Sequence, residues 1–340
     1  MKKEKRVRLA LVGTDSLRGK EIKDVLSRQE FHFEGIDFFD PDVEEEYSKL
    51  TQFRGKPCVI HHLDEDSLVG SDLVFLAADK KINRKYGILA GQQKFQVIDL
   101  SEAFNQDKNV PLAVAGINDN SVVEDKPQII ANPHPVTIIL SHVFNVIQKE
   151  LGLSKAIAFI LQPASAFEES GIEELAHQTV AVLNSTSLSK KVFKTQIAFN
   201  LLSYTEPMDK NGFSSAEKQI MAEIKRVLKS VTFPLSLAIV QAPVFHTYSI
   251  MIYLELEKKA EMQALRELFK ASPYFQLSAP SVSSPVSCAS VAGQGKIFID
   301  QIKKDSFLPH SFWIWVVADN LTRGSALNAA EIAKKIIQSP

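Results

Sequence analysis

Two glycines flank a short turn, Gly13-Thr14-Asp15-Ser16-Leu17-Arg18-Gly19, which follows an apolar run and precedes a stretch at helical spacing. Such a turn can cradle the phosphates of a nucleotide, because backbone N–H groups and the positive end of a helix dipole meet there. The middle position is Ser16, whose Cβ hinders the close approach of a pyrophosphate. The spacing alone leaves two interpretations open, a dinucleotide site and a structural strand-to-helix turn.

Acidic residues accompany and follow the second predicted strand: Asp37, Asp40, Asp42, Glu44, Glu45 and Glu46. An acidic side chain there suits a ribose with a free 2′-hydroxyl and repels the 2′-phosphate of NADP. A solvated acidic loop is the simpler interpretation. We expect NADP binding to be weak or absent.

The histidines and cysteines form no recognisable catalytic or metal set. His61 and His62 are adjacent, so on a strand they point to opposite faces and cannot share one metal ion. Cys58 and Cys288 lack an obvious activating environment and are expected to be inert thiols. The sequence contains no G-x-S-x-G motif, no Walker loop and no C-x-x-C pair.

Composition is typical of a globular protein, and 340 residues suggest two domains. The 39 basic and 40 acidic residues leave a net charge of −1, which offers no footprint for nucleic acid or for an anionic membrane surface. Two cysteines are too few for a disulfide framework, and the basic N-terminus lacks the long apolar stretch of a signal peptide. A soluble, cytoplasmic protein is therefore expected.

The first third of the chain alternates short β-rich runs with helical stretches. This order predicts an α/β domain with a parallel, doubly wound sheet of the Rossmann type. The predicted strands are residues 7–12, 33–39, 72–77, 95–99 and 110–115, and the predicted helices are 19–26 and 84–91.

The pattern changes after a turn at 132–135, and a central α+β domain is expected. Its predicted strands are 156–161, 192–200, 236–245, 248–255 and 296–302, and the helices are 136–151, 170–183, 215–230 and 259–272, with a last helix at 325–337. Strands 236–245 and 248–255 carry apolar residues on both faces. One face would cover the helices, and the other needs a partner, so a homodimer is expected.

Several passages together resemble the aspartate-β-semialdehyde dehydrogenase family. The stretch 317–329, V-A-D-N-L-T-R-G-S-A-L-N-A, is similar to that family's D-N-L-R-K-G-A-A-L-N-A signature, and Ile130-Ala131-Asn132-Pro133 is similar to the segment before its catalytic cysteine. The likeness covers residues 6–337. It implies a Rossmann domain made of residues 1–134 and 318–340, and a dimerisation domain made of residues 135–317.

The resemblance also implies a chemistry, in which a cysteine thiolate attacks an aldehyde, a histidine serves as acid and base, NADP takes the hydride and phosphate releases the acyl group. In this sequence the nucleophile position is Pro135, and the acid/base position is Tyr248. Gln241 and Asn105 stand where arginines hold the substrate carboxylate and the phosphate. Proline supplies no nucleophile, so the covalent step has no donor.

At the other positions that the resemblance implies, this sequence has lost some of the family's residues and retained others. Ala216 and Gln219 replace a glutamate and a lysine of the central helix, whereas Asn132 and Gln162 are retained. The cofactor positions that the resemblance implies are Gly13, Ser16, Gly19 and Asn320.

We expect a catalytically degenerate family member that acts as a dimeric binding or scaffold protein with an unknown small-molecule ligand. NAD(P) is implied by the resemblance alone. One alternative is a residual or altered oxidoreductase activity on a semialdehyde-like substrate through Tyr248, His246 and Ser165. On a strand, His246 would share a face with Tyr248. A second alternative is a nucleotide sensor that keeps the Gly13–Gly19 turn.

Overall fold

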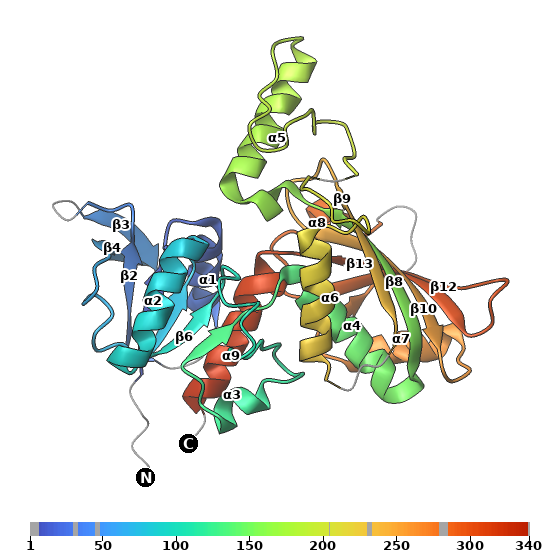
Figure 1. Ribbon diagram of the computed structural model, residues 1–340, viewed down its shortest axis with the longest axis horizontal. Helices are drawn as coiled ribbons and strands as arrows, with labels where there is room; N and C mark the ends of the chain where they lie inside the picture. The colour runs from blue at the N-terminus through green and yellow to red at the C-terminus, as the bar shows by residue number, and fades with distance from the viewer. Residues whose placement is uncertain are drawn as a thin grey trace. The chain divides into compact units, whose positions relative to one another are not determined.

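The computed structural model describes residues 7–29, 33–44, 48–203, 205–229, 233–278 and 285–338. The chain divides into two compact units, Met1–His134 with Ser325–Pro340, and Pro135–Gly324. Each unit contains one sheet (Figure 1). Among the described residues, no helix combines the length and the apolar composition that crossing a membrane requires.

The first unit contains a seven-stranded sheet in the order β3-β4-β2-β1-β5-β6-β7. All neighbours are parallel except β3, which is antiparallel to β4. The strands are β1 Arg8–Val12, β2 Gly35–Asp40, β3 Lys49–Phe53, β4 Lys56–His62, β5 Leu73–Leu76, β6 Gln96–Asp99 and β7 Ile129–Ala131. Because β1 lies between β2 and β5, the connections diverge at its carboxyl end, where ligands of such sheets bind.

Helices cover both faces of this sheet (Figure 1). They are α1 Leu17–Arg28, α2 Lys80–Gln93, α3 Asn120–Glu124 and α9 Leu327–Gln338. Side chains alternate along β1, so Leu9 and Leu11 join the core of α1 and α9, whereas Ala10 and Val12 join that of α2. The doubly wound α/β architecture is confirmed.

The second unit contains a six-stranded mixed sheet in the order β11-β12-β13-β10-β8-β9. Its strands are β8 Leu153–Gln162, β9 Leu235–Gln241, β10 Tyr248–Leu256, β11 Phe275–Leu277, β12 Ile297–Lys304 and β13 Ser311–Ala318. Its helices are α4 Pro135–Leu151, α5 Glu168–Leu183, α6 Ser215–Val227, α7 Met262–Ala271 and α8 Cys288–Val291. Helices α4, α6 and α7 pack on the sheet and on one another, so they cover one face. The predicted α+β character is confirmed.

The opposite face of this sheet carries apolar side chains that are open to solvent. Ile157, Tyr253 and Trp313 are register neighbours across β8, β10 and β13. Ile157 is 46% exposed, Phe159 44% and Trp313 39%. This group of exposed apolar side chains, on the face opposite α4, α6 and α7, is a candidate interface.

The chain returns to the first unit later than the sequence indicates. The boundary expected at residue 318 lies at Ser325 in the structure. The reason is that Asp319 accepts hydrogen bonds from the Leu321, Thr322 and Gly293 backbone N–H groups, which keeps the segment after β13 in the second unit.

The strand predicted at 110–115 is wrong. Apart from a bridge between Leu112 and Ala131 and backbone turn bonds at Val110 and Val114, its backbone groups bind side-chain amides. Asn328 accepts from the Ala115 N–H at 2.9 Å and donates to the Ala113 carbonyl at 3.0 Å. Asn118 accepts from the Val114 N–H at 2.8 Å and donates to the Leu112 carbonyl at 2.8 Å. The apolar run is buried without being a strand.

The strand predicted at 192–200 is wrong for the same reason. Glu174 on α5 accepts from the backbone N–H groups of Lys191, Val192 and Phe193 at 2.6, 2.8 and 3.0 Å. One turn later, Gln178 donates to the Ser189 and Thr195 carbonyls and accepts from the Ile197 and Ala198 N–H groups. Burial alone would raise the pKa of Glu174, but the donated hydrogen bonds hold this pKa below its ordinary value.

We expect Glu174→Ala to lower the free energy of unfolding by about 3 kcal/mol, because three backbone donors lose their acceptor and cannot all reach water. Glu173→Ala is the matched control, since Glu173 is the exposed neighbour on the same helix. Urea denaturation measures both variants. Equal stability of the two would show that the loop does not depend on the Glu174 carboxylate.

Candidate functional site

The turn between β1 and α1 is closely packed at both of its glycines. Gly13 has a φ of +80°, and a Cβ there would lie 2.4 Å from the Ala78 nitrogen. A Cβ on Gly19 would lie 1.9 Å from the Gly13 carbonyl oxygen. Both positions therefore require glycine, and the turn packs against the segment after β5.

Ser16 is the N-cap of α1. Its hydroxyl oxygen accepts from the Gly19 N–H at 2.9 Å and lies 2.9 Å from the Gly13 carbonyl and 2.8 Å from the Ala77 carbonyl. The hydroxyl is thus turned toward the protein. Helix capping accounts for a serine at this position, a role that the sequence analysis missed.

Asp40, at the carboxyl end of β2, is buried and holds the same turn from the other side. Its carboxylate accepts from the backbone N–H of Asp15 at 3.0 Å and of Asp42 at 3.1 Å. Asp15 is ion-paired with Lys49. The hydrogen bond to Asp15, and after it the charges of Asp15, Asp40 and Asp42, raise the pKa of Lys49. Glu45 and Glu46 of the acidic run lie outside the described residues.

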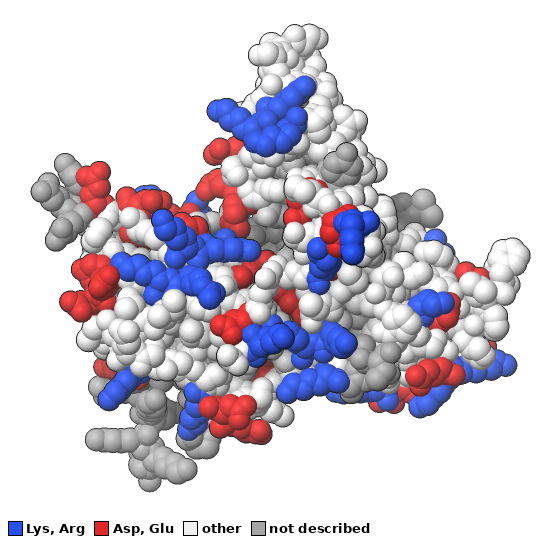
Figure 2. All heavy atoms as spheres, in the orientation of Figure 1, with Lys and Arg blue, Asp and Glu red and all other residues white. Residues whose placement is uncertain are grey.

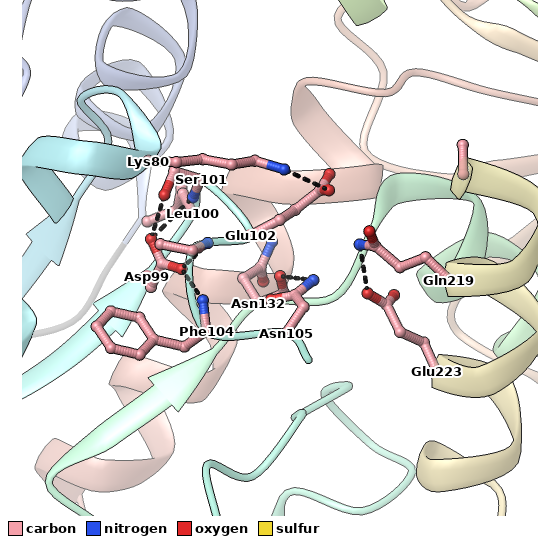
Figure 3. A network of polar contacts seen from close by, with 12 residues as sticks. Lys80, Asp99, Leu100, Ser101, Glu102, Phe104, Asn105, Asn132, Gln219 and Glu223 are labelled. Carbon is pink, nitrogen blue, oxygen red and sulfur yellow. Dashed lines mark hydrogen bonds and ion pairs between the residues drawn. The ribbon is translucent and has the colours of Figure 1, made fainter. Parts of the chain in front are cut away.

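Asp99, at the end of β6, organises the loop that contains Asn105 (Figure 3). This fully buried carboxylate accepts from the Ser101 hydroxyl at 2.7 Å and from the Ala103 N–H at 2.8 Å, and also from the Asn83 side chain. In the same loop, Glu102 forms an ion pair with Lys80. The carboxylates of Asp99 and Glu102 therefore hold this loop in place.

Asn105 and Asn132 are brought together in the first unit, and a third asparagine joins them. The Asn105 amide donates to the Asn132 carbonyl at 3.4 Å, and the Asn132 side-chain oxygen accepts from Asn328 at 2.8 Å. All three are buried. The retained Asn132 is therefore part of a structural amide network, in which Asn328 was not foreseen from the sequence.

In the second unit, three predicted site residues meet at the ends of adjacent strands. Gln162 donates to the Gln241 side-chain oxygen at 3.1 Å and accepts from the Tyr248 hydroxyl at 3.5 Å. The Gln241 nitrogen donates to the carbonyls of Gln162 and Ala242 at 3.0 and 3.2 Å, which uses both of its protons. This glutamine–tyrosine row, Gln162, Gln241 and Tyr248, is buried and uncharged.

Asn320 lies beside this row and uses both ends of its amide. Its oxygen accepts from the Thr247 backbone N–H at 3.1 Å, and its nitrogen donates to the Ser165 hydroxyl at 3.0 Å. Thr247 has a φ of +73°, which is an outlier for a β-branched residue. Its buried hydroxyl has no hydrogen-bond partner among the described residues. Asn320 therefore anchors a strained backbone.

Pro135 is the first residue of α4, where proline is well tolerated. It faces Gly324 closely, since a Cβ on Gly324 would lie 2.8 Å from the Pro135 Cβ. The structure gives Pro135 a helix-initiating and packing role.

Gln219 is not in the glutamine–tyrosine row. It lies on α6 and donates to Glu223 at 2.8 Å (Figure 3), and the other Glu223 oxygen accepts from the Thr137 hydroxyl at 2.7 Å. The Ala216 N–H, one turn earlier, donates to Glu206. This region of α6 joins α4 through a buried carboxylate.

His246 and His142 are the described histidines to consider as an acid/base near Tyr248. His246 lies in a bend before β10, and the left-handed conformation of Thr247 breaks strand alternation, so the shared-face argument for His246 and Tyr248 does not hold. His142 on α4 is buried and stacks on Tyr274, with ring centroids 4.0 Å apart. Burial, and then the charge of Arg323, lower the pKa of His142 well below its ordinary value. Within the described part of the chain, no group of acidic, histidine or cysteine side chains is arranged to hold a metal ion.

Two protein-family models match the chain. The model described as semialdehyde dehydrogenase, NAD binding domain, matches residues 8–124. The model described as semialdehyde dehydrogenase, dimerisation domain, matches residues 145–323.

Individual relatives agree with these models. An aspartate-semialdehyde dehydrogenase of Aquifex aeolicus is 28% identical over 335 residues, which is 97% of this chain and 98% of the relative. One of Bacillus subtilis is 26% identical over 337 residues, 96% of each chain. The crystal structure of aspartate semialdehyde dehydrogenase II from Vibrio cholerae superposes with a TM-score of 0.90 at 23% identity, over 98% of this chain and 99% of its own, and it bears on the fold alone.

We expect Thr247→Gly to raise the free energy of unfolding by about 1 kcal/mol. Relief of the left-handed strain and of the unsatisfied hydroxyl outweighs the larger chain entropy of glycine in the unfolded state. Thr247→Ala is the control, because it removes the hydroxyl and keeps the Cβ. A glycine variant no more stable than the alanine variant in urea denaturation would contradict backbone strain at this position.

Proposed function

Because the chain belongs to the semialdehyde dehydrogenase family, we propose that it is a catalytically degenerate member that acts as a dimeric binding or scaffold protein. The observation that carries this proposal is the glutamine–tyrosine row. At positions that the family resemblance assigns to an acid/base and to a carboxylate-binding cation, the side chains are neutral and bonded to one another.

The covalent step is the first that these residues do not support. An aldehyde must be attacked by a nucleophile, and Pro135 has none to offer. Its position as the first residue of α4, packed against Gly324, supports a structural reason for proline. Neither of the two cysteines is near position 135 in the sequence. Cys58 belongs to β4 and Cys288 to α8.

Proton transfer and substrate binding meet similar obstacles. A tyrosine titrates about three pH units above a histidine, and Tyr248 is buried besides. Gln241 donates both amide protons to backbone carbonyls, so it has no donor left for a substrate carboxylate. An altered oxidoreductase that relies on Tyr248 and Ser165 has less support, because the Ser165 hydroxyl is engaged by Asn320.

The exposed apolar sheet face supports the dimeric part of the proposal. Ile157, Phe159 and Trp313 stand on the side of the sheet opposite α4, α6 and α7. The residues matched by the dimerisation-domain model include all three. A second copy of the chain would remove this surface from water, at about 25 cal/mol for each Å² of apolar area.

We expect neither the wild-type chain nor Pro135→Cys to reduce NADP⁺ or NAD⁺ with aspartate semialdehyde and phosphate. A restored thiol still lacks a base of suitable pKa, a deficit of about 10²–10⁴ in rate, and cations that orient the substrate. The assay compares both proteins with an authentic dehydrogenase, and Pro135→Ala controls for changes in α4. Turnover by either protein within about a hundredfold of the authentic enzyme would overturn the proposal.

We expect Phe159→Asp to convert a dimer into a monomer, because a carboxylate in an apolar interface is costly to desolvate. Phe307→Asp is the matched control, since Phe307 is 93% exposed and lies outside the sheet, between β12 and β13. Light scattering at micromolar concentration gives the mass. A monomeric wild-type chain, or a dimeric Phe159→Asp variant, would argue against this interface.

A further inference from the structure

The turn after β1 keeps two of the glycines typical of a dinucleotide pyrophosphate site and has Ser16 in place of the middle one. Glycines at positions 13 and 19 let the chain fold tightly at the carboxyl end of the central strand. Ser16 caps the third residue of α1, Gly19, and leaves Leu17 as the first residue, whose N–H points out of the helix end. The match of residues 8–124 to an NAD binding domain indicates a nucleotide here independently of this geometry.

The carboxyl end of β2, where the adenosine ribose of such a nucleotide lies, does not fit a 2′-phosphate. Asp40 ends this strand and is held in place by the Asp15 and Asp42 backbone N–H groups. The side chains of Asp15 and Asp42 add two more carboxylates, and Lys49 is paired with the first of them. Figure 2 shows acidic side chains gathered on the part of the first unit that carries β2, β3 and β4. A 2′-phosphate would bring negative charge close to the carboxylates of Asp40 and Asp42.

A ribose hydroxyl fits the same place. Each Asp40 oxygen accepts one backbone N–H and retains acceptor capacity, so the carboxylate can also accept from a 2′-hydroxyl. The two backbone bonds fix the carboxylate before any ligand arrives, and little rotamer entropy is lost on binding.

We infer that the first unit takes a nucleotide whose adenosine ribose has a free 2′-hydroxyl, as in NAD(H), and rejects the 2′-phosphate of NADP(H), with Asp40 as the specificity-determining residue. This inference rests on family membership and does not require the chain to be catalytic. It departs from the NADP that the family resemblance implies.

Calorimetric titration of the full chain with NAD⁺ and with NADP⁺ tests the inference. We expect NAD⁺ to bind at least about tenfold more tightly, which corresponds to an unfavourable charge contact of about 1.4 kcal/mol for NADP⁺. The preference falls as salt is raised from 0.05 to about 0.5 M, because the repulsion is screened. Equal affinities, or no NAD⁺ binding at millimolar concentration, would overturn the inference.

Two variants and one control assign the effect to residues. Asp40→Asn should weaken NAD⁺ and abolish the preference, whereas Asp37→Asn, on the same strand and paired with Arg8, should change neither. Since Asp40→Asn also disturbs the turn, Asp42→Arg is the second variant: Asp42 is exposed, and its side chain makes no bond to Asp40 in the turn. We expect it to strengthen NADP⁺ about tenfold more than it strengthens NAD⁺, because the arginine acts most strongly on the additional 2′-phosphate. An unchanged NADP⁺ affinity in both variants would refute a charge-based mechanism.

The outcome is separable from that of the proposed function. Binding is measured without aldehyde or phosphate, so an inactive chain can still show the NAD⁺ preference. Conversely, turnover of the aldehyde would overturn catalytic degeneracy and leave the choice between the two nucleotides to the titration.

Discussion

Buried backbone N–H and C=O groups must find hydrogen-bond partners, and both units of this chain depend on side chains to provide them in irregular segments. Asp40 and Asp99 do so at the carboxyl ends of β2 and β6. Asn328 does so for the apolar segment before α3, and Glu174 for the loop after α5. Each of these side chains is buried, and each fixes a loop that would otherwise carry unsatisfied polar groups.

The need of buried polar groups for hydrogen-bond partners also explains why the glutamine–tyrosine row contains neutral side chains bonded to one another. The family resemblance implies an arginine at position 241, whose guanidinium would need a substrate anion as its partner. Gln241 instead donates both amide protons to backbone carbonyls of the protein. A neutral amide in a closed network costs little to bury, whereas an arginine without its anion would be expensive. The glutamine–tyrosine row thus satisfies its own polar groups without a charged side chain.

Much of the fold was predictable because local patterns of apolar and polar residues determine it. Apolar alternation and helical spacing correctly placed β1, β8 and β10 and the helices α4 and α6. The failures at 110–115 and 192–200 have one cause, since their backbone groups bind side chains that local patterning cannot identify, and Asn328 is more than two hundred positions from Ala115. Within the site, the resemblance identified Pro135 and Tyr248, but the mutual bonding of Gln162 and Gln241 required the register of β8 and β9.

The loop after α5 has a further consequence for how the second unit opens. Glu174 and Gln178 are one helical turn apart, and they reach the loop only while α5 is helical there. Fraying of that turn withdraws both side chains together and releases several loop amides at once. Helix and loop therefore form one cooperative element, in which amides without regular secondary structure share the exchange protection of a helix.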